Sequence, residues 1–337
     1  MTAQFHDPVN KVNADEQLPE NTPHKKHGVV VGVDGSKRSL AAAVWALREA
    51  ARINEPLTLV SAYTLPIFPS VAVDAATGGH EDSALAQSCR QILEATTAEL
   101  GETDVEIRTA VEMGDPASVL VDYSYDAELL AAGPRGRGGF LGLLVGSVSR
   151  GLPARAQCPV VLVPRGAEAS RAGTNAPVVV ASDGSEQGRV AMLRAAEEAL
   201  RRVPTCRLRV ITAMAPVSSA VEWLPSTVDE RAMFDELRDK INAGVAWLQD
   251  HFPKLEIESE VIDGVPVDAV VAESESARLT VVGTRGLGGF TGALLGSTSQ
   301  GIASHARGPV MIVPYADDPR LEDRAEYGPM IDQEPTE

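Results

Sequence analysis

The sequence is poor in the residue types that mark disulfide scaffolds, zinc modules and membrane proteins. It contains three cysteines in 337 residues, with no CxxC pair and no histidine at metal-ligand spacing from them. This pattern argues against a disulfide framework and favours the reducing cytoplasm. The chain also lacks the apolar run of about 18 residues that a membrane-spanning helix needs. Its first residues have no apolar segment of the kind found in signal peptides.

Aromatic residues and positive charge are scarce as well. Phe, Trp and Tyr make up 4% of the chain, so the core is expected to be aliphatic. Lys and Arg number 30 against 47 Asp and Glu, which gives a net charge of −17. Such a chain repels phosphate backbones and anionic lipids, so we expect neither nucleic-acid binding nor membrane insertion. Six of the net negative charges lie in residues 316–337, which we interpret as a solvated acidic tail.

The chain repeats itself at an interval of 149–150 residues. The segment VVVGVDGS from Val29 returns as VVVASDGS from Val178, and GPRGRGGFLGLLVGS from Gly133 returns as GTRGLGGFTGALLGS from Gly283. An interval of this size is a whole domain, because solenoid repeats run at roughly 20–50 residues. The predicted organisation is a polar N-terminal arm over 1–26, a first domain over 27–165, a second domain over 176–315 and the acidic tail over 316–337.

Each copy alternates apolar strands with amphipathic helices. In the first copy we expect strands at 29–33, 57–63, 105–111, 128–132 and 159–163, and helices at 36–53, 81–100, 116–125 and 147–157. Alternation of this kind predicts an α/β fold with two tandem, doubly wound, five-stranded parallel sheets of Rossmann-like type. In the first helix, the spacing places Leu40, Val44, Leu47 and Ala51 on one face, which we expect to pack on the sheet.

The last strand of each copy is apolar and would form an unprotected edge of its sheet. These strands, 159–163 and 309–313, are rich in Val, Ile, Leu and Met. An apolar edge strand needs cover. Our hypothesis is that the two strands pair with each other about a pseudo-twofold axis that relates the domains.

Glycines gather where parallel sheets bind ligands, beyond the carboxyl ends of the strands. The loop after the fourth strand reads G-x2-G-x9-G-S in both copies. Glycines let backbone N–H groups approach a polyphosphate, and a helix that begins at the final serine offers further N–H groups. These residues are Gly133, Arg135, Gly136, Gly146 and Ser147 in the first copy, and Gly283, Arg285, Gly286, Gly296 and Ser297 in the second.

The arginine in each loop can meet phosphate, and the hydroxyls of Ser149 and Ser299 are further candidate donors. A simpler interpretation is that the glycines only form turns and that Asp34 and Ser36 only cap a helix. Conservation of the whole spacing in both copies of the repeat favours phosphate binding.

These motifs resemble those of tandem universal stress proteins over residues 27–315. The glycine pattern followed by Ser or Thr is that family's nucleotide-binding signature, and both copies have it. The resemblance implies ATP as cofactor in each domain, with Mg carried by its phosphates. It also implies contacts at the end of the first strand, at the end of the second strand and at the start of the last helix. Those further residues are Gly32, Val33, Asp34, Ala62 and Val148 in the first domain, and Ala181, Ser182, Asp183, Ala213 and Thr298 in the second.

The two copies differ within the loop. Pro134 stands where the second copy has Thr284, and proline has no N–H to offer a phosphate. Arg137 stands against Leu287, so the first loop is more basic. The two sites therefore need not bind equally well.

No catalytic motif accompanies the glycine loops. The sequence has no Walker loop, no GxGxxG and no GxSxG. We therefore expect a regulatory ATP-binding protein in the stress response, cytoplasmic, with no catalytic residue and no metal ligand of its own. It would act through a protein partner and be at most a slow ATPase, with Asp34 or Asp183 positioning water. Association of two chains into a homodimer is left open.

Two alternatives remain at this point. One is an enzyme of the adenine-nucleotide α-hydrolase-like group, although that group's pyrophosphate loop is missing after the first strand. The other is a structural pseudo-dimer that binds no nucleotide.

Overall fold

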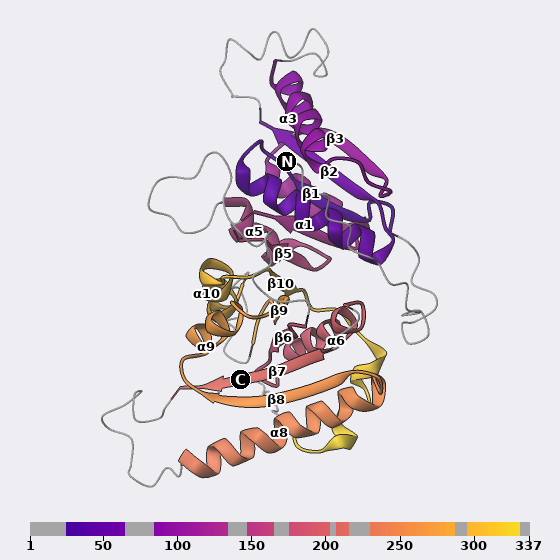
Figure 1. The fold of residues 1–337 in the computed structure, drawn as a ribbon. Helices are drawn as coiled ribbons and strands as arrows, with labels where there is room; N and C mark the ends of the chain where they lie inside the picture. Colours follow the sequence, from indigo (N-terminus) through magenta and orange to yellow (C-terminus); the bar gives the residue numbers. More distant parts are fainter. Residues whose placement is uncertain are drawn as a thin grey trace, which may run out of the picture.

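The computed structural model describes residues 25–64, 84–133, 147–164, 175–202, 207–215, 230–286 and 295–330. In these ranges ten strands form one sheet in the order β3-β2-β1-β4-β5-β10-β9-β6-β7-β8. Figure 1 shows the two halves of this sheet on either side of β5 and β10. The strands are β1 (Val29–Gly32), β2 (Leu57–Tyr63), β3 (Ile107–Met113), β4 (Leu129–Ala132), β5 (Val160–Leu162), β6 (Val178–Ala181), β7 (Arg207–Met214), β8 (Glu256–Asp263), β9 (Leu279–Gly283) and β10 (Val310–Val313).

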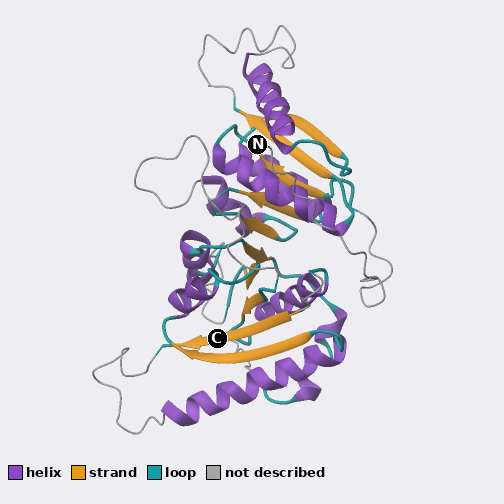
Figure 2. Ribbon diagram, viewed as in Figure 1, coloured by secondary structure: helices purple, strands orange, loops and turns teal. Residues whose placement is uncertain are grey.

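Helices cover both faces of the sheet (Figure 2). They are α1 (Lys37–Ile53), α3 (Ala84–Leu100), α4 (Pro116–Tyr123), α5 (Ser147–Arg155), α6 (Glu186–Leu200), α8 (Glu230–His251), α9 (Pro266–Glu273) and α10 (Ser297–His305). Short 3-10 helices add η3 (Ser124–Asp126), η4 (Pro319–Leu321) and η5 (Arg324–Tyr327). The predicted class, two tandem five-stranded α/β domains, is confirmed.

The two domains join through their last strands. β5 and β10 pair antiparallel, with Val160 opposite Ile312 and Leu162 opposite Val310. All other pairs in the sheet are parallel. The hypothesis that the apolar edge strands cover each other is confirmed, since this pairing removes two exposed edges and makes one continuous sheet.

Alternate strand residues belong to two apolar layers, one on each face of the sheet. Val29 and Val31 belong to the layer under α1 and α6, whereas Val30 belongs to the layer on the opposite face. The second copy alternates in the same way at Val178 and Val179. Each layer contains residues of both domains, so the domains share their cores across the β5–β10 junction.

A buried cluster of charges lies between α1 and α6. Glu198 is completely buried and pairs with Arg202 and, at 2.8 Å, with Arg194. Arg202 also reaches Glu49 of the first domain at 3.2 Å, and Arg52 lies 3.7 Å from Glu198. Burial by itself would raise the pKa of Glu198, but the surrounding guanidinium groups outweigh it and hold that pKa well below its usual range.

Two details of the predicted elements are wrong. The third strand runs over Ile107–Met113, two residues later than expected, because its register is set by β2, where Leu57 pairs with Ile107 and Tyr63 with Met113. Helix α1 buries a face made mainly of small residues. Of the predicted face, Leu47 packs against this core, whereas Leu40 and Val44 are only half-buried and Ala51 is exposed.

The C-terminal segment is not a solvated tail over its described part. Residues 315–330, which we call the strap, pack against α6 and α8, and Arg324 within them is 4% exposed. The indole Nε1 of Trp247 donates to the carbonyl of Arg320 and to Asp323. Asp318 pairs with Arg320 of the strap itself, and Asp323 pairs with Trp247 and His251 of α8. Residues 331–337 lie outside the described part.

Cys158 is expected to be inert in the folded protein. Burial raises the pKa of its thiol to about 12, and only the thiolate reacts readily with alkylating reagents. Iodoacetamide at pH 8 should therefore leave Cys158 unlabelled in the native chain and label it fully in urea, as measured by peptide mass spectrometry. Rapid native labelling at Cys158 would contradict this.

Candidate functional site

The turns after β1 and β6 have the same construction. The carboxylate of Asp34 accepts the N–H of Ser36 at 3.0 Å, and that of Asp183 accepts the N–H of Ser185 at 3.0 Å. The central glycines, Gly35 and Gly184, take positive φ values of 76° and 79°, which glycine adopts without strain. The repeated DGS sequence thus forms the same tight turn at the carboxyl edge of the sheet in both domains.

Each of these turns ends in a helix cap. The Ser36 hydroxyl accepts the N–H of Ser39 and caps α1, and the Ser185 hydroxyl accepts the N–H of Gly188 and caps α6. The simpler interpretation of this segment as a capped turn is therefore correct for its local geometry. It does not account for the glycine loop, which lies beside the turn in the second domain.

In the second domain the glycine loop lies against Asp183. A Cβ placed on Gly286 would be 2.1 Å from the Asp183 carboxylate, and one on Gly283 would be 3.2 Å from the backbone oxygens of Gln187 and Arg285. A side chain on Gly286 would require the loop or the Asp183 carboxylate to move, and one on Gly283 would fit only tightly. The fold therefore brings the first-strand aspartate and the loop glycines, about one hundred residues apart in the chain, into direct contact.

Helix α10 begins at this loop, and no side chain among the described residues caps it. Its N-cap residue is Gly296, and its first turn contains no acidic residue. Ser297 and Thr298, at its start, are exposed. An uncapped helix N-terminus with positive partial charge favours an anion. Arg285, also exposed, lies in the loop that precedes it.

Two expected phosphate donors are already engaged. The Ser299 hydroxyl is buried and donates to the carbonyl of Gly283 at 2.7 Å, so it holds the loop to α10. The N–H of Thr284 donates to the carbonyl of Val313, and its hydroxyl donates to Gln187. The expectation that Thr284 offers an N–H that Pro134 lacks is therefore wrong, because strand β10 already takes that N–H.

The corresponding loop of the first domain is only partly described. Gly133 ends its described part, and a Cβ there would be 2.9 Å from the carbonyl oxygen of Arg38. The predicted residues Arg135, Gly136 and Gly146 lie outside the described residues, as do Pro134 and Arg137. The backbone at the predicted positions Ser147, Val148 and Ser149 forms the start of α5.

The remaining predicted residues lie at the same edge of the sheet. Gly32 and Ala181 end β1 and β6, and Val33 and Ser182 continue the ladders by donating to strands β2 and β7. Ala62 and Ala213 lie near the ends of β2 and β7 and are half-buried. The structure thus gathers the predicted first-strand, second-strand and loop positions of the second domain at one edge.

Sequence reasoning missed two residues of this edge. Gln187 contacts the loop through its side chain, which accepts the Thr284 hydroxyl at 3.1 Å. Arg189 donates to the carbonyl of Gly184 at 3.1 Å. Their position on the first turn of α6, beside the repeated DGS turn, is the only signal in the sequence that could have indicated them.

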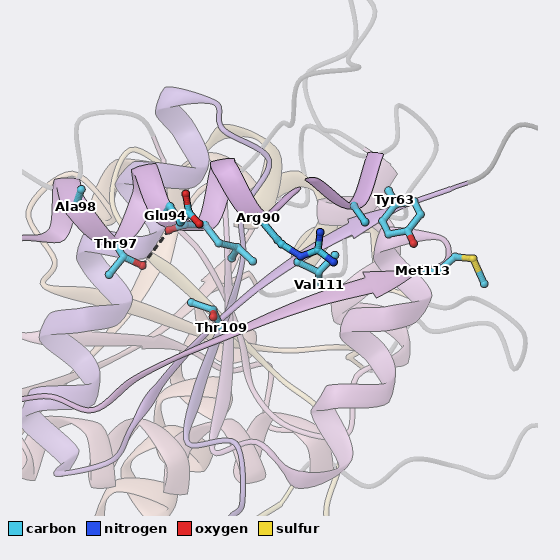
Figure 3. Close-up of a pocket in the computed structure, with 10 residues that line it drawn as sticks. Tyr63, Arg90, Glu94, Thr97, Ala98, Thr109, Val111 and Met113 are labelled. Carbon is cyan, nitrogen blue, oxygen red and sulfur yellow. Dashed lines mark hydrogen bonds between the residues drawn. The ribbon is translucent and has the colours of Figure 1, made fainter. Parts of the chain in front are cut away.

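A separate cleft of about 910 Å³ lies between α3 and β3 (Figure 3). Arg90 and Glu94 of α3 and Thr109 and Val111 of β3 line it, together with Tyr63 at the end of β2. None of the predicted nucleotide-site residues lines this cleft, and it lies at the outer edge of the first domain.

Two other features are absent from the described residues. No group of three or more His, Cys, Asp or Glu side chains in them is arranged to hold a metal ion. No helix among them is long and apolar enough to cross a membrane.

Comparison with known proteins identifies relatives along most of the chain. The model of the Universal stress protein family matches residues 27–164 and again residues 174–314. Universal stress protein Rv2005c of Mycobacterium tuberculosis is 33% identical over 293 residues, which cover 86% of this chain and 98% of that protein. Universal stress protein Rv2623 of the same organism is 33% identical over 297 residues, with 85% and 95% covered.

A solved structure shares the fold. The crystal structure of a universal stress protein from Archaeoglobus fulgidus superimposes with a TM-score of 0.61 at 19% identity, and the match covers 86% of this chain and 98% of that one. The two family matches and these relatives show that the chain belongs to the universal stress protein family, as a member with two such domains in tandem.

Proposed function

We propose that each domain binds ATP and that nucleotide occupancy controls the binding of a partner protein in the stress response. The observation that carries this proposal is the N-terminus of α10, which no described side chain caps and which follows a loop that packs closely on the Asp183 turn at Gly286. Backbone N–H groups at such a terminus suit a phosphate group. The same glycine pattern in the first domain supports a second site there.

The residues of the second site fit a nucleotide in two parts. Gly296, Ser297 and Thr298 would hold phosphate at the start of α10, and the exposed Arg285 adds positive charge. Asp183 and Ala213, at the ends of two adjacent strands, would face the adenosine part. Mg would be held through the phosphates, and bound ATP would supply a phosphoanhydride bond. In the first domain the equivalent phosphate-site residues are Gly133, Arg135, Gly136, Gly146, Ser147, Val148 and Ser149.

The described residues favour a regulator over an enzyme. Asp34 and Asp183 each accept a backbone N–H within their own turn. These hydrogen bonds suit residues that hold the turn in position. We therefore propose at most slow hydrolysis of ATP. The proposed domains are 27–165 and 176–315, and the proposed location is the cytoplasm, in keeping with the buried free thiols of Cys89 and Cys158.

The proposal is tested by identifying and counting the bound nucleotide. Native mass spectrometry of the purified chain, followed by equilibrium dialysis with labelled MgATP, is expected to give two ATP molecules per chain. Turnover should stay far below the ~1 per second of slow ordinary enzymes. Failure to bind ATP would contradict the proposal and favour a structural pseudo-dimer. Rapid release of AMP or pyrophosphate would favour the α-hydrolase-like alternative.

A further inference from the structure

The strap touches the second nucleotide site at both of its ends. At its start, the Tyr315 hydroxyl lies 2.9 Å from the carboxylate of Glu186, the first residue of α6. At its other end, the Arg189 guanidinium reaches Met330 Sδ at 3.5 Å and, through the same nitrogen, the carbonyl of Gly184 at 3.1 Å. Glu186 and Arg189 lie on the first turn of α6. That turn begins directly after the Asp183–Ser185 turn of the proposed site.

Between these ends the strap contacts first α6 and then α8. Arg320 pairs with Glu197, near the end of α6, at 2.7 Å, and its guanidinium lies over the Phe252 ring at 5.6 Å. Asp323 then accepts the Trp247 indole and pairs with His251, both on α8. The strap therefore runs from the first turn of α6 to its last turn and crosses to α8.

The return path along α8 is anchored by a buried arginine. The Arg324 guanidinium donates to the carbonyls of Lys240 and of Gly328 and Pro329. A Cβ on Gly328 would be 3.2 Å from Ala243, so the strap packs closely on α8 there. The middle of the strap is thus held by α8, and its two ends are held at α6.

The first domain lacks the two residues on the first turn of α6 that contact the strap. At the 149-residue offset, Lys37 takes the place of Glu186 and Leu40 takes the place of Arg189. A lysine cannot accept a hydrogen bond from a tyrosine hydroxyl, and a leucine cannot donate to a turn carbonyl. The two DGS turns have the same backbone form, and in the described part of the chain the strap contacts the helix turn that follows the second of them.

We propose that the strap is a clamp that stiffens the Asp183–Ser185 turn and makes the second nucleotide site the tighter of the two. A stiffer turn holds Asp183 beside Gly286 before a ligand arrives, so less ordering is needed on binding. A partner that displaced the strap from α8 would loosen the turn and weaken nucleotide binding. The effect on nucleotide rests on the proposed function, whereas the stiffening of the turn does not.

The test uses full-length variants that change only the strap ends. Tyr315→Phe with Met330→Ala removes both contacts to the first turn of α6 and leaves Arg324 and the α8 contacts in place. Tyr327→Phe is the matched control, because that hydroxyl contacts Asp250 on α8 and not the site. Hydrogen exchange without nucleotide is followed at the amides of Ser185, Gly188 and Arg189.

We expect exchange at these amides to rise about fivefold in the strap-end variant, as for loss of one hydrogen bond of ~1 kcal/mol. Tyr327→Phe should leave it unchanged, and the equivalent amides of the first domain, at Ser36 and Ser39, should not change in either variant. Arg189→Leu, which installs the residue of the first domain, should have the same effect as the strap-end variant. Unchanged exchange in both the strap-end variant and Arg189→Leu would overturn the clamp.

Binding of MgATP is then measured by calorimetry on the same proteins. The strap-end variant is expected to weaken the tighter of two sites about fivefold and to leave the other unchanged. Faster exchange with unchanged ATP affinity would overturn the proposal that the strap tightens nucleotide binding. A wild-type chain that binds no ATP contradicts the proposed function, and the exchange measurement still decides whether the strap clamps the turn.

Discussion

Replacement of Glu198 by glutamine is expected to lower the free energy of unfolding by about 3–5 kcal/mol, the cost of breaking a buried ion pair. The carboxylate is completely buried and faces Arg52, Arg194, Arg201 and Arg202. Glutamine keeps nearly the same shape but leaves several guanidinium groups without their counter-charge. Because Arg52 comes from the first domain, the loss should weaken the contact between domains as well as the second domain.

The measurement is equilibrium urea unfolding at pH 7, followed by tryptophan fluorescence. The control is Glu275→Gln, which removes the same group from an exposed pair with Arg307 and should cost less than about 1 kcal/mol. If Glu198→Gln costs no more than Glu275→Gln, the buried cluster contributes little and the prediction is wrong.

The effect of Glu198→Gln should depend on pH in a defined direction. The pKa of Glu198 is lower in the folded chain than the usual glutamate value of about 4.3 in the unfolded one. Its stabilising contribution is therefore complete well above pH 4.3 and falls as pH drops toward the folded pKa. The difference in unfolding free energy between wild type and variant should be largest near neutral pH and should narrow in acid.

Substitution of Gly286 by alanine is expected to weaken ATP binding at the second site by about tenfold to one hundredfold. A Cβ at this position would be 2.1 Å from the Asp183 carboxylate, so either the loop or the aspartate must move. Overpacking of this kind costs about 1–3 kcal/mol, and 1.4 kcal/mol is about tenfold in affinity. Calorimetry with MgATP should show the tighter of the two sites weakened by this factor and the other site unchanged.

Gly264→Ala provides the matched control. It is also a glycine at the carboxyl edge of the second half-sheet, but a Cβ there meets no atom within 4 Å. This variant should bind ATP as the wild type does, and both variants should keep the wild-type circular dichroism spectrum. If Gly286→Ala binds two ATP molecules with unchanged affinity, the loop is not the phosphate site.

Much of the fold followed from the sequence because its signals are local or repeated. Continuous apolar runs indicated buried strands, and β2 begins and ends at the predicted residues. The repeat doubled every observation and predicted a glycine loop at the carboxyl edge of each half-sheet, which the described residues include beyond its first glycine only in the second domain. The cover of one apolar edge strand by the other also followed, because two such strands in one chain have few other means of protection.

The candidate site was predictable in its parts but not in its contacts. Residue type and spacing indicated Gly286 and the start of α10, and the resemblance to universal stress proteins implied Asp183. The way in which the loop folds back decides its contacts. Asp183 lies against Gly286, and the Ser299 hydroxyl and the Thr284 N–H donate to carbonyls of the protein itself. Such hydrogen bonds join residues distant in sequence, and periodicity contains no information about them.

Local sequence therefore determined the elements, their order and the chemistry of the loops, whereas tertiary structure decided which surfaces meet. Helix α1 packs through Ala42, Ala46 and Ala50 and not through its larger Leu40 and Val44, because small side chains allow a helix close to the sheet. The acidic segment was expected in solvent from its charge alone. It instead packs on the second domain as the strap. Arg320 and Arg324 of the strap contact α6 and α8, and the Trp247 indole of α8 donates to Asp323 of the strap. These partners are in place only once the second domain has formed.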